Sequence, residues 1–342
     1  MIRLLQKLSE TSGVSGYEGP VRALIRKEIE EYVDDLSVDA MGNLIAFKKG
    51  KGKEPRVMLA AHMDEVGFMV TRIEKNGFVR ISTLGGIDRR VIPGKRVLVG
   101  KEKIPGVIGF KAPHLVPREA RGTVPKIEEF YVDVGASEDK ELQGTVNIGD
   151  PVVFDTKFKR LGRTVVKGKA FDDRVGCAVL AHLVKNFTPP FPLYAVFTVQ
   201  EEVGLRGARV VAHRITPDIA IVLEGTGAGD FYIKKDVGKY PVLGGGPAIT
   251  VMDRSCICDP VLVKFLIDTA KKQGIPYQFK RPGVGGTDAG RIHLAREGIR
   301  SAVISVPCRY IHSPVGVASV SDIEGVYQLV VSALQNLKGG LE

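Results

Sequence analysis

The chain has 342 residues, of which 44% are hydrophobic and 26% charged, a globular composition at a length beyond one average domain, so a single small module and global disorder are excluded. The formal net charge is +10, but basic residues alternate with acidic ones, Trp is absent and no basic stretch is interleaved with aromatic rings, so nucleic acid is not an expected partner. No apolar run is long enough to span a membrane and polar residues interrupt the opening segment, so we expect no membrane contact and no export.

The first part of the chain has an α/β pattern. Apolar residues at helical spacing predict an amphipathic helix over 18–33. Two short strands are expected at 36–39 and 43–47, and the apolar run over 56–61 predicts a buried strand. Ionisable residues follow this buried strand directly, which is where open α/β sheets bind their ligands.

Residues 66–161 form a different region, in which short alternating strands are divided by Gly and Pro and no convincing helix occurs. The α/β pattern then returns, with helices expected at 173–187, 205–213, 259–273, 288–297 and 321–337, and strands at 193–199, 219–223, 247–251 and 300–305. The predicted fold is therefore an α/β, mixed-sheet domain formed by residues 1–65 and 162–342. A small β-barrel-like domain, residues 66–161, is inserted into it and is expected to mediate dimerisation or oligomerisation.

Side chains that can bind metal ions gather where predicted strands end or loops begin. They are His62 and Asp64 in AHMDEVG, Asp172 and Asp173 in AFDDRVG, Glu201 and Glu202 in VQEEVG, Glu224 in VLEGTG, and His312 in YIHSP. Taken singly, each is more often a satisfied polar residue, a helix N-terminus or a solvated face. Together they indicate one site, because four strands deliver carboxylate or imidazole groups to one edge of a sheet.

The composition of this site favours divalent metal ions. Two imidazoles with several carboxylates hold more negative charge than a dry pocket accommodates without cations. Mixed nitrogen and oxygen ligands suit Zn²⁺, Co²⁺ or Mn²⁺ better than Ca²⁺ or Mg²⁺. A pair of ions that share one bridging carboxylate and activate a water molecule is the natural arrangement.

Other notable residues have structural interpretations or remain open. His182, His213 and His293 lie in predicted helices and are expected to be structural. His114 lies in a basic loop of the β-region and is either a surface residue or one that reaches a site on a neighbouring subunit. The segment 283–291, GVGGTDAGR, lacks the pattern of a phosphate-binding loop, so it is either a plain turn or a close backbone approach to substrate.

The four cysteines are too few and too scattered for a disulfide framework; they are Cys177, Cys256, Cys258 and Cys308. Cys256 and Cys258 are separated by one residue, which is not the spacing of zinc knuckles. We therefore expect buried thiols in a cytoplasmic protein.

Taken in order, the segments SGVSGYE, AHMDEVGFMV, AFDDRVGCAVL, VQEEVGLRGA, GGTDAG and the closing His-Ser-Pro resemble the cocatalytic metallo-aminopeptidases of the tetrahedral (TET) type, which include glutamyl and deblocking aminopeptidases. The resemblance spans nearly the whole chain. It implies a zinc-exopeptidase-like fold, hydrolysis of N-terminal residues from short peptides, and self-assembly into a homo-oligomer, a hollow tetrahedral dodecamer.

The resemblance also implies a set of ligands for two divalent ions, Zn²⁺ or Co²⁺. Asp172 would bridge the ions. His62 and Glu224 would complete one site, and Glu202 and His312 would complete the other. Position 224 holds Glu where relatives more often have Asp, so this ligand is one methylene longer.

Three further expectations come from the same resemblance. Glu201 would be the general base, and Asp64 the carboxylate that orients His62. The Asp172–Asp173 peptide is predicted to be cis. The chain departs from relatives after Asp230, where the dipeptide 231–232 replaces a proline-glycine, so substrate preference does not carry over from any relative.

Two alternative functions remain open from the sequence. Paired carboxylates also serve glycoside hydrolases, and some relatives carry an endoglucanase label. A non-catalytic metal-binding assembly protein would share the ligands but would not need Glu201. Release of amino acids from peptides, without release of sugar from glucans, separates the three.

Overall fold

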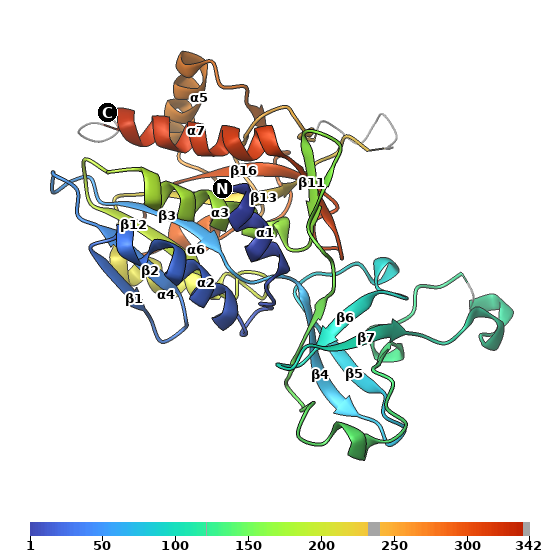
Figure 1. Ribbon diagram of the computed structural model, residues 1–342. Coiled ribbons are helices and arrows are strands. Elements are labelled where there is room, and N and C mark those ends of the chain that lie inside the picture. Colours follow the sequence, from blue (N-terminus) through green and yellow to red (C-terminus); the bar gives the residue numbers. More distant parts are fainter. Residues whose placement is uncertain (121, 232–239, 338–342) are drawn as a thin grey trace.

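The computed structural model describes residues 1–120, 122–231 and 240–337, and it has two parts (Figure 1). One is an 11-stranded sheet flanked by helices, and the other is a closed six-stranded barrel that projects from one end of the sheet. The predicted α/β class with an inserted barrel is confirmed. Within the described ranges, no helix is both long and apolar enough to cross a bilayer.

The centre of the large sheet consists of four strands, β12 (Leu193–Thr198), β3 (Val57–His62), β13 (Ile219–Gly227) and β16 (Arg300–Arg309). Neighbours in this order pair in parallel. Their runs of Val, Ile, Leu and Ala are buried along most of their length, because helices cover both faces of the sheet. Parallel strands place all four carboxyl ends at one edge.

Shorter strands extend the sheet on both sides in the order β1-β2-β12-β3-β13-β16-β17-β11-β10, and β14 and β15 join beside β16. Their bounds are β1 (Asp35–Val38), β2 (Leu44–Lys48), β10 (Lys159–Leu161), β11 (Val165–Gly168), β14 (Ala248–Thr250), β15 (Gln278–Phe279) and β17 (Gly316–Ser319). The β10–β11 hairpin pairs with β17 and so belongs to the sheet, although β10 falls within the range 66–161 expected for the insert. The sheet therefore resumes a few residues before the expected boundary.

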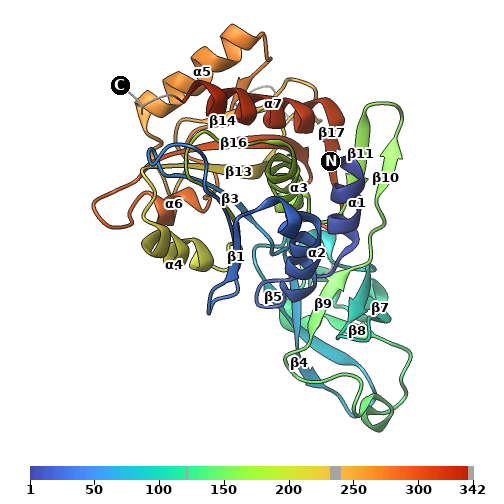
Figure 2. The same cartoon turned by 60° about the vertical axis from the view of Figure 1, so that its left-hand side comes forward.

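Helices cover the two faces of the sheet (Figure 2). On one face α3 (Phe171–Asn186) packs on β3 and β13, and α1 (Ile2–Glu10), α2 (Gly19–Ile29) and α7 (Val320–Asn336) pack beside it, with α5 (Pro260–Gln273) against α7. On the other face lie α4 (Arg206–Ile215) and α6 (Ala289–Ile292).

Two helices differ from the sequence expectation. Helix α1 was not predicted, although Leu4, Leu5 and Leu8 form its buried stripe. The helix predicted over 288–297 is only the short α6; the chain turns after it, and Arg296, within the predicted range, has φ of 57°.

The barrel has the order β4-β5-β8-β7-β6-β9. Its strands are β4 (Gly67–Ile73), β5 (Val79–Leu84), β6 (Arg96–Val99), β7 (Ile104–Gly109), β8 (Tyr131–Asp133) and β9 (Pro151–Phe154). Its core is a separate apolar cluster in which Phe68 and Phe154 meet edge to face, with ring centroids 5.4 Å apart. Closure removes the free strand edges that a small sheet would expose.

Candidate active site

The site residues reach one edge of the large sheet because of strand register. Strand β3 ends at His62, which pairs with Thr198 at the end of β12. Strand β13 pairs Val222 with Ala60, so Glu224, two residues further on, stands level with His62. The carboxyl ends of β12, β3 and β13 therefore lie side by side, and the residues at these ends gather at one place on the edge of the sheet.

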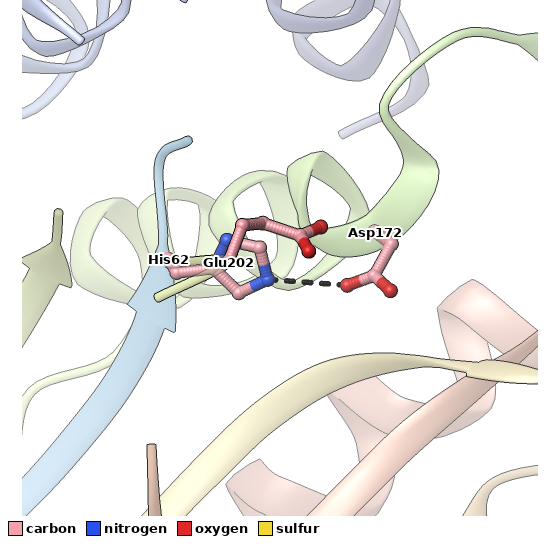
Figure 3. A group of neighbouring side chains, drawn as sticks. All are labelled: His62, Asp172 and Glu202. Atoms are coloured by element: carbon pink, nitrogen blue, oxygen red, sulfur yellow. Dashed lines mark hydrogen bonds and ion pairs between the residues drawn. The ribbon is translucent and has the colours of Figure 1, made fainter. Parts of the chain in front are cut away.

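Asp172 lies between two imidazoles. Its Oδ1 is 3.1 Å from Nε2 of His62, and its Oδ2 is 3.2 Å from Nε2 of His312. Figure 3 shows the Asp172 carboxylate, at the start of α3, facing the His62 ring, with Glu202 beside both. Each oxygen of one carboxylate thus faces a different imidazole nitrogen, which is the arrangement expected of a bridging carboxylate.

The other ring nitrogen of each histidine faces a backbone carbonyl. Nδ1 of His62 is 3.0 Å from the carbonyl oxygen of Asp64, and Nδ1 of His312 is 2.9 Å from that of Gly86. If Nδ1 carries the proton in a neutral ring, Nε2 presents its lone pair to the site. Both rings are therefore oriented as metal ligands usually are.

Two glutamates complete the group. Oε1 of Glu224 is 3.4 Å from Nε2 of His62, and Oε2 of Glu202 is 3.6 Å from Nε2 of His312. Burial, together with the negative charge of Asp172, raises the pKa of Glu224 to about 8 and that of Glu202 to about 7, although the imidazoles oppose this. Without cations, the site holds more carboxylate than it can keep ionised at neutral pH.

The same contacts between imidazoles and carboxylates also shift the pKa values of His312 and Asp172. Burial lowers the pKa of His312, but the hydrogen bond to Asp172 and the charge of Glu202 outweigh burial and raise that pKa to about 9. Burial opposes ionisation of Asp172 too, yet His312 and His62 lower its pKa far below the usual value. A divalent ion would take the place of these protons as the source of positive charge.

The residues present fit divalent metal ions. Two groups of side chains could each hold a metal ion, because the ligand atoms within each group all lie within 4.8 Å of one another. One group is His62, Asp172 and Glu202, and the other is His62, Asp173 and Glu224. Among the described residues, Oε2 of Glu224 is one of the few buried polar atoms without a hydrogen-bond partner. A free carboxylate oxygen at that depth is costly unless a cation or water completes it.

Asp173 has a different environment from its neighbour. Its Oδ1 accepts a hydrogen bond from the Gly176 amide at 2.9 Å, and its Oδ2 accepts one from the His62 amide at 3.2 Å. Both oxygens are therefore engaged by the main chain at the start of α3. The Asp172–Asp173 peptide is cis, as predicted.

Glu201 lines a cavity of about 500 Å³ next to this centre. The cavity wall also includes Asp172, Glu202, Glu224 and His312. Burial, with the charges of nearby carboxylates, raises the pKa of Glu201 well above its usual value. A carboxyl group at this position faces the same cavity as the proposed metal ligands, where it could exchange a proton with a bound water molecule.

Asp64 contacts more than His62. Its Oδ1 is 3.4 Å from Nδ1 of His62, and its two oxygens also accept the amide hydrogens of Glu201 at 3.0 Å and Glu202 at 3.1 Å. Ser15 donates its hydroxyl to the same carboxylate at 2.6 Å. Asp64 thus orients the two glutamates as well as the imidazole.

Sequence reasoning missed one group at the site and flagged another only as part of the segment 283–291. The carbonyl of Gly86, in the loop after β5, contacts His312, which lies 226 positions further along the sequence. The only sequence signal for this close backbone approach is the pair of glycines at 85 and 86. Asp288 is buried, and burial raises its pKa to about 6. Its Oδ2 accepts the Thr198 hydroxyl at 2.5 Å. The segment 283–291 was flagged for a substrate approach, and residues 284–286 line the cavity.

Other flagged residues lie elsewhere. His182 packs against Tyr327 on the helical face, and Nδ1 of His293 is 2.7 Å from a carbonyl of its own helix turn. His114 is exposed on the barrel loop. The four cysteines are free and buried, as predicted. Tyr232, part of the departure from relatives, lies outside the described residues.

Comparison with known proteins decides among the functions left open by the sequence. A lysyl aminopeptidase of Pyrococcus furiosus is 37% identical over 98% of this chain and 97% of its own length. A glutamyl aminopeptidase of Lactococcus lactis is 35% identical over 93% and 91%. The TET aminopeptidase of Thaumarchaeota archaeon SCGC AB-539-E09 has a similar structure, with a TM-score of 0.94 and 39% identity over 98% and 97% of the two chains.

Two further solved structures bear on assembly and on the alternatives. The Pyrococcus horikoshii TET1 peptidase, described as assembling into a tetrahedron or an octahedral shell, has a TM-score of 0.86 and 34% identity over 97% and 98% of the chains. A Thermotoga maritima structure named an endoglucanase has a TM-score of 0.81 and 38% identity over 96% of each chain. Because it shares fold and sequence with the aminopeptidases, its name does not support a separate glycosidase class.

The fold and the site define a peptide-bond hydrolase, an aminopeptidase with groups suited to metal ions. The family model described as M42 glutamyl aminopeptidase matches residues 42–329. The chain belongs to this family.

Proposed function

We propose that this chain is a dinuclear-metal aminopeptidase that removes N-terminal residues from short peptides. The observation that carries the proposal is the Asp172 carboxylate, whose two oxygens face the imidazole nitrogens of His62 and His312 at 3.1 and 3.2 Å. With Glu224 beside the first imidazole and Glu202 beside the second, the donors divide into two sets that share Asp172. Zn²⁺ or Co²⁺ suits these nitrogen and oxygen ligands.

The proposed chemistry assigns each side chain a task. Bound divalent ions would polarise the scissile carbonyl and lower the pKa of a water molecule. Glu201, on the cavity wall, would accept a proton from the attacking water and pass it to the leaving amine. Asp64 would hold the Glu201 and Glu202 amides and the His62 ring in place.

A metal titration with a substrate screen tests this function. Chelation should abolish hydrolysis of aminoacyl anilides, and added Zn²⁺ or Co²⁺ should restore it. Because relatives named for lysyl and for glutamyl substrates are similarly close, the screen should include basic, acidic and apolar N-terminal residues. Full activity in verified metal-free protein, or release of sugar from glucans in place of amino acids, would contradict the proposal.

We also propose that the chain forms a homo-oligomer, a tetrahedral dodecamer, in which the insert 66–161 makes the main subunit contact and the catalytic domain comprises 1–65 and 162–342. Support comes from similar structures described as a dodecamer and as a tetrahedron. The described part of the insert also exposes large apolar side chains, among them Val107, Leu115, Val124 and Ile148. If an insert-deleted chain sedimented like the full-length oligomer, this division would be wrong.

A cytoplasmic location is part of the same proposal. All four cysteines are free and buried, which suits a reducing compartment. Fractionation of the native host followed by immunodetection tests it.

A further inference from the structure

Residues 199–202 connect β12 to the turn before α4, and they carry Glu201 and Glu202. Each of the four successive amides in this segment donates to a side chain. The acceptors are Asn43 Oδ1 for Val199 at 3.1 Å, Glu18 Oε1 for Gln200 at 3.1 Å, and the two Asp64 oxygens for Glu201 and Glu202 at 3.0 and 3.1 Å. Side chains from distant parts of the chain therefore fix the main chain beneath both glutamates.

This segment needs such support for two reasons. Gln200 has φ of 55°, a left-handed conformation that is unfavourable for a residue other than glycine. The Glu201 carboxylate also shares its cavity with the carboxylates of Glu202 and Glu224, whose negative charges repel it. Without outside acceptors, the turn would relax away from the cavity.

The Glu18 side chain does not cap the helix that it precedes. It is the N-cap residue of α2, yet its side chain makes no capping hydrogen bond to that helix. It is 4% exposed, and its Oε1 accepts the Gly16 amide at 2.8 Å together with the Gln200 amide. Burying a carboxylate is costly, so its turn away from the helix toward Gln200 indicates a function there.

Glu18 also lies outside the cavity that Glu201 lines. It borders a second cavity of about 440 Å³, which Gln200 also lines. The contact between Glu18 and the segment that carries Glu201 is made through the Gln200 amide and not across the wall of that cavity.

We propose that Glu18 is a positioning residue, which holds the Gln200 amide and thereby fixes the Glu201 carboxylate at the reaction centre. This inference rests on the proposed role of Glu201 as general base. It predicts that a neutral acceptor of the same length serves as well as the carboxylate, because the interaction is a hydrogen bond accepted from two amides.

Three substitutions test the proposal in the full-length, metal-loaded protein. Glu18→Ala removes the acceptor, and Glu18→Asp shortens it by one methylene while keeping the charge. Both should lower kcat by about 10–100-fold, with KM and metal content near wild type, because misplacement of a catalytic group acts on the chemical step. Glu18→Gln keeps the acceptor and should retain kcat within about threefold.

Asp322→Ala is the matched control. Asp322 is likewise buried, and it accepts two loop amides, from Gly244 at 2.7 Å and Gly246 at 2.9 Å, away from the 199–202 segment. It should lose thermal stability as Glu18→Ala does but keep kcat. A similar loss of kcat in Asp322→Ala, or an unchanged kcat in both Glu18→Ala and Glu18→Asp, would overturn the proposal.

Hydrogen exchange gives a readout that does not depend on activity. Amides 200–202 should exchange faster in Glu18→Ala and Glu18→Asp and at the wild-type rate in Glu18→Gln. Unchanged exchange in all variants, or a Glu18→Gln variant that behaves like Glu18→Ala, would also refute the role of Glu18. If the wild-type protein showed no metal-dependent aminopeptidase activity, the proposed function would fail, while the exchange data would still decide whether Glu18 holds this turn.

Discussion

The barrel and the large sheet differ in what they bury. Within the described part of the barrel, Asp150 is the one buried ionisable residue, at 7% exposure. The large-sheet unit buries many, among them His62, Asp64, Glu65, Lys169, Asp173, Arg174, Glu224, Asp253, Asp288 and Asp322. The barrel core is almost entirely apolar, whereas the sheet unit accepts the costly burial of charge where chemistry needs it.

The two regions also handle charge differently. In the barrel, Arg80 pairs with Glu74 at 2.9 Å, and both side chains are partly exposed. In the sheet unit, Lys169 and Glu65 pair at 2.5 Å with both side chains at 4% exposure or less. Only a large apolar core can offset several buried ion pairs, so the active site belongs to the larger unit.

The largest expected effect concerns the buried base. Glu201→Gln should lower kcat by about 10²–10⁴-fold, because a proton acceptor is lost while no proposed ligand is removed. Metal content, measured by mass spectrometry, should stay near wild type. His62→Ala and His312→Ala should lose metal instead. Equal metal loss in all three variants would mean that base and ligands are wrongly assigned.

Core truncation should separate the two regions. Phe154→Ala in the barrel and Phe197→Ala in β12 both remove fully buried rings, and each should cost about 3–5 kcal/mol of unfolding free energy. Only Phe197→Ala should also weaken metal binding, since its strand leads to Glu201. Denaturant unfolding with metal titration measures both quantities. A comparable loss of metal affinity in Phe154→Ala would contradict the expectation that only the large-sheet unit supports the metal site.

The pH dependence of stability should come from the sheet unit. In metal-free protein the pKa values of Glu202, Glu224 and His312 are raised to about 7, 8 and 9. The native state then binds more protons than the unfolded chain from about pH 5 to 9, so stability falls as pH rises through this window, by about 1.4 kcal/mol per pH unit for each extra proton.

Denaturant unfolding of chelated protein at several pH values within that window measures this slope. Bound metal should remove it, because the ions replace the protons as partners of the carboxylates. A slope of the same size in metal-loaded protein would place its origin outside the site.

The smallest effect tests a contact that the loop after β5 makes with the site. Gly85 and Gly135 both have φ of 81°, so alanine at either position is strained by about 1–2 kcal/mol. At Gly85 the added carbon would also lie 2.9 Å from Val66 and 3.3 Å from Oε2 of Glu202, whereas at Gly135 it meets nothing within 4 Å. Gly85→Ala should therefore weaken metal binding about tenfold, and Gly135→Ala should not. Identical metal titrations for the two variants would show that the loop does not support the site.

The sequence by itself determined the groups at the sheet edge. Apolar runs that end in His62, Glu201 and Glu224 identify parallel strands and their carboxyl ends, because a strand covered on both faces is apolar throughout and polar groups can only follow it. The inserted barrel could also be predicted from the sequence, since its strands alternate with Gly and Pro turns. The exact helix bounds could not be predicted, as the short α6 shows, because a left-handed residue such as Arg296 leaves no signal in the spacing of apolar residues.

Only the tertiary structure decided how these groups are held. Glu18 reaches the Gln200 amide across 182 positions, and the Gly86 carbonyl reaches His312 across 226. Such contacts use a backbone group on one side, and every residue except proline carries the same amide and every residue the same carbonyl, so no residue type marks them. The periodicity of a sequence records which face of an element is buried. Which distant amide a buried carboxylate meets depends on the packing of the whole chain.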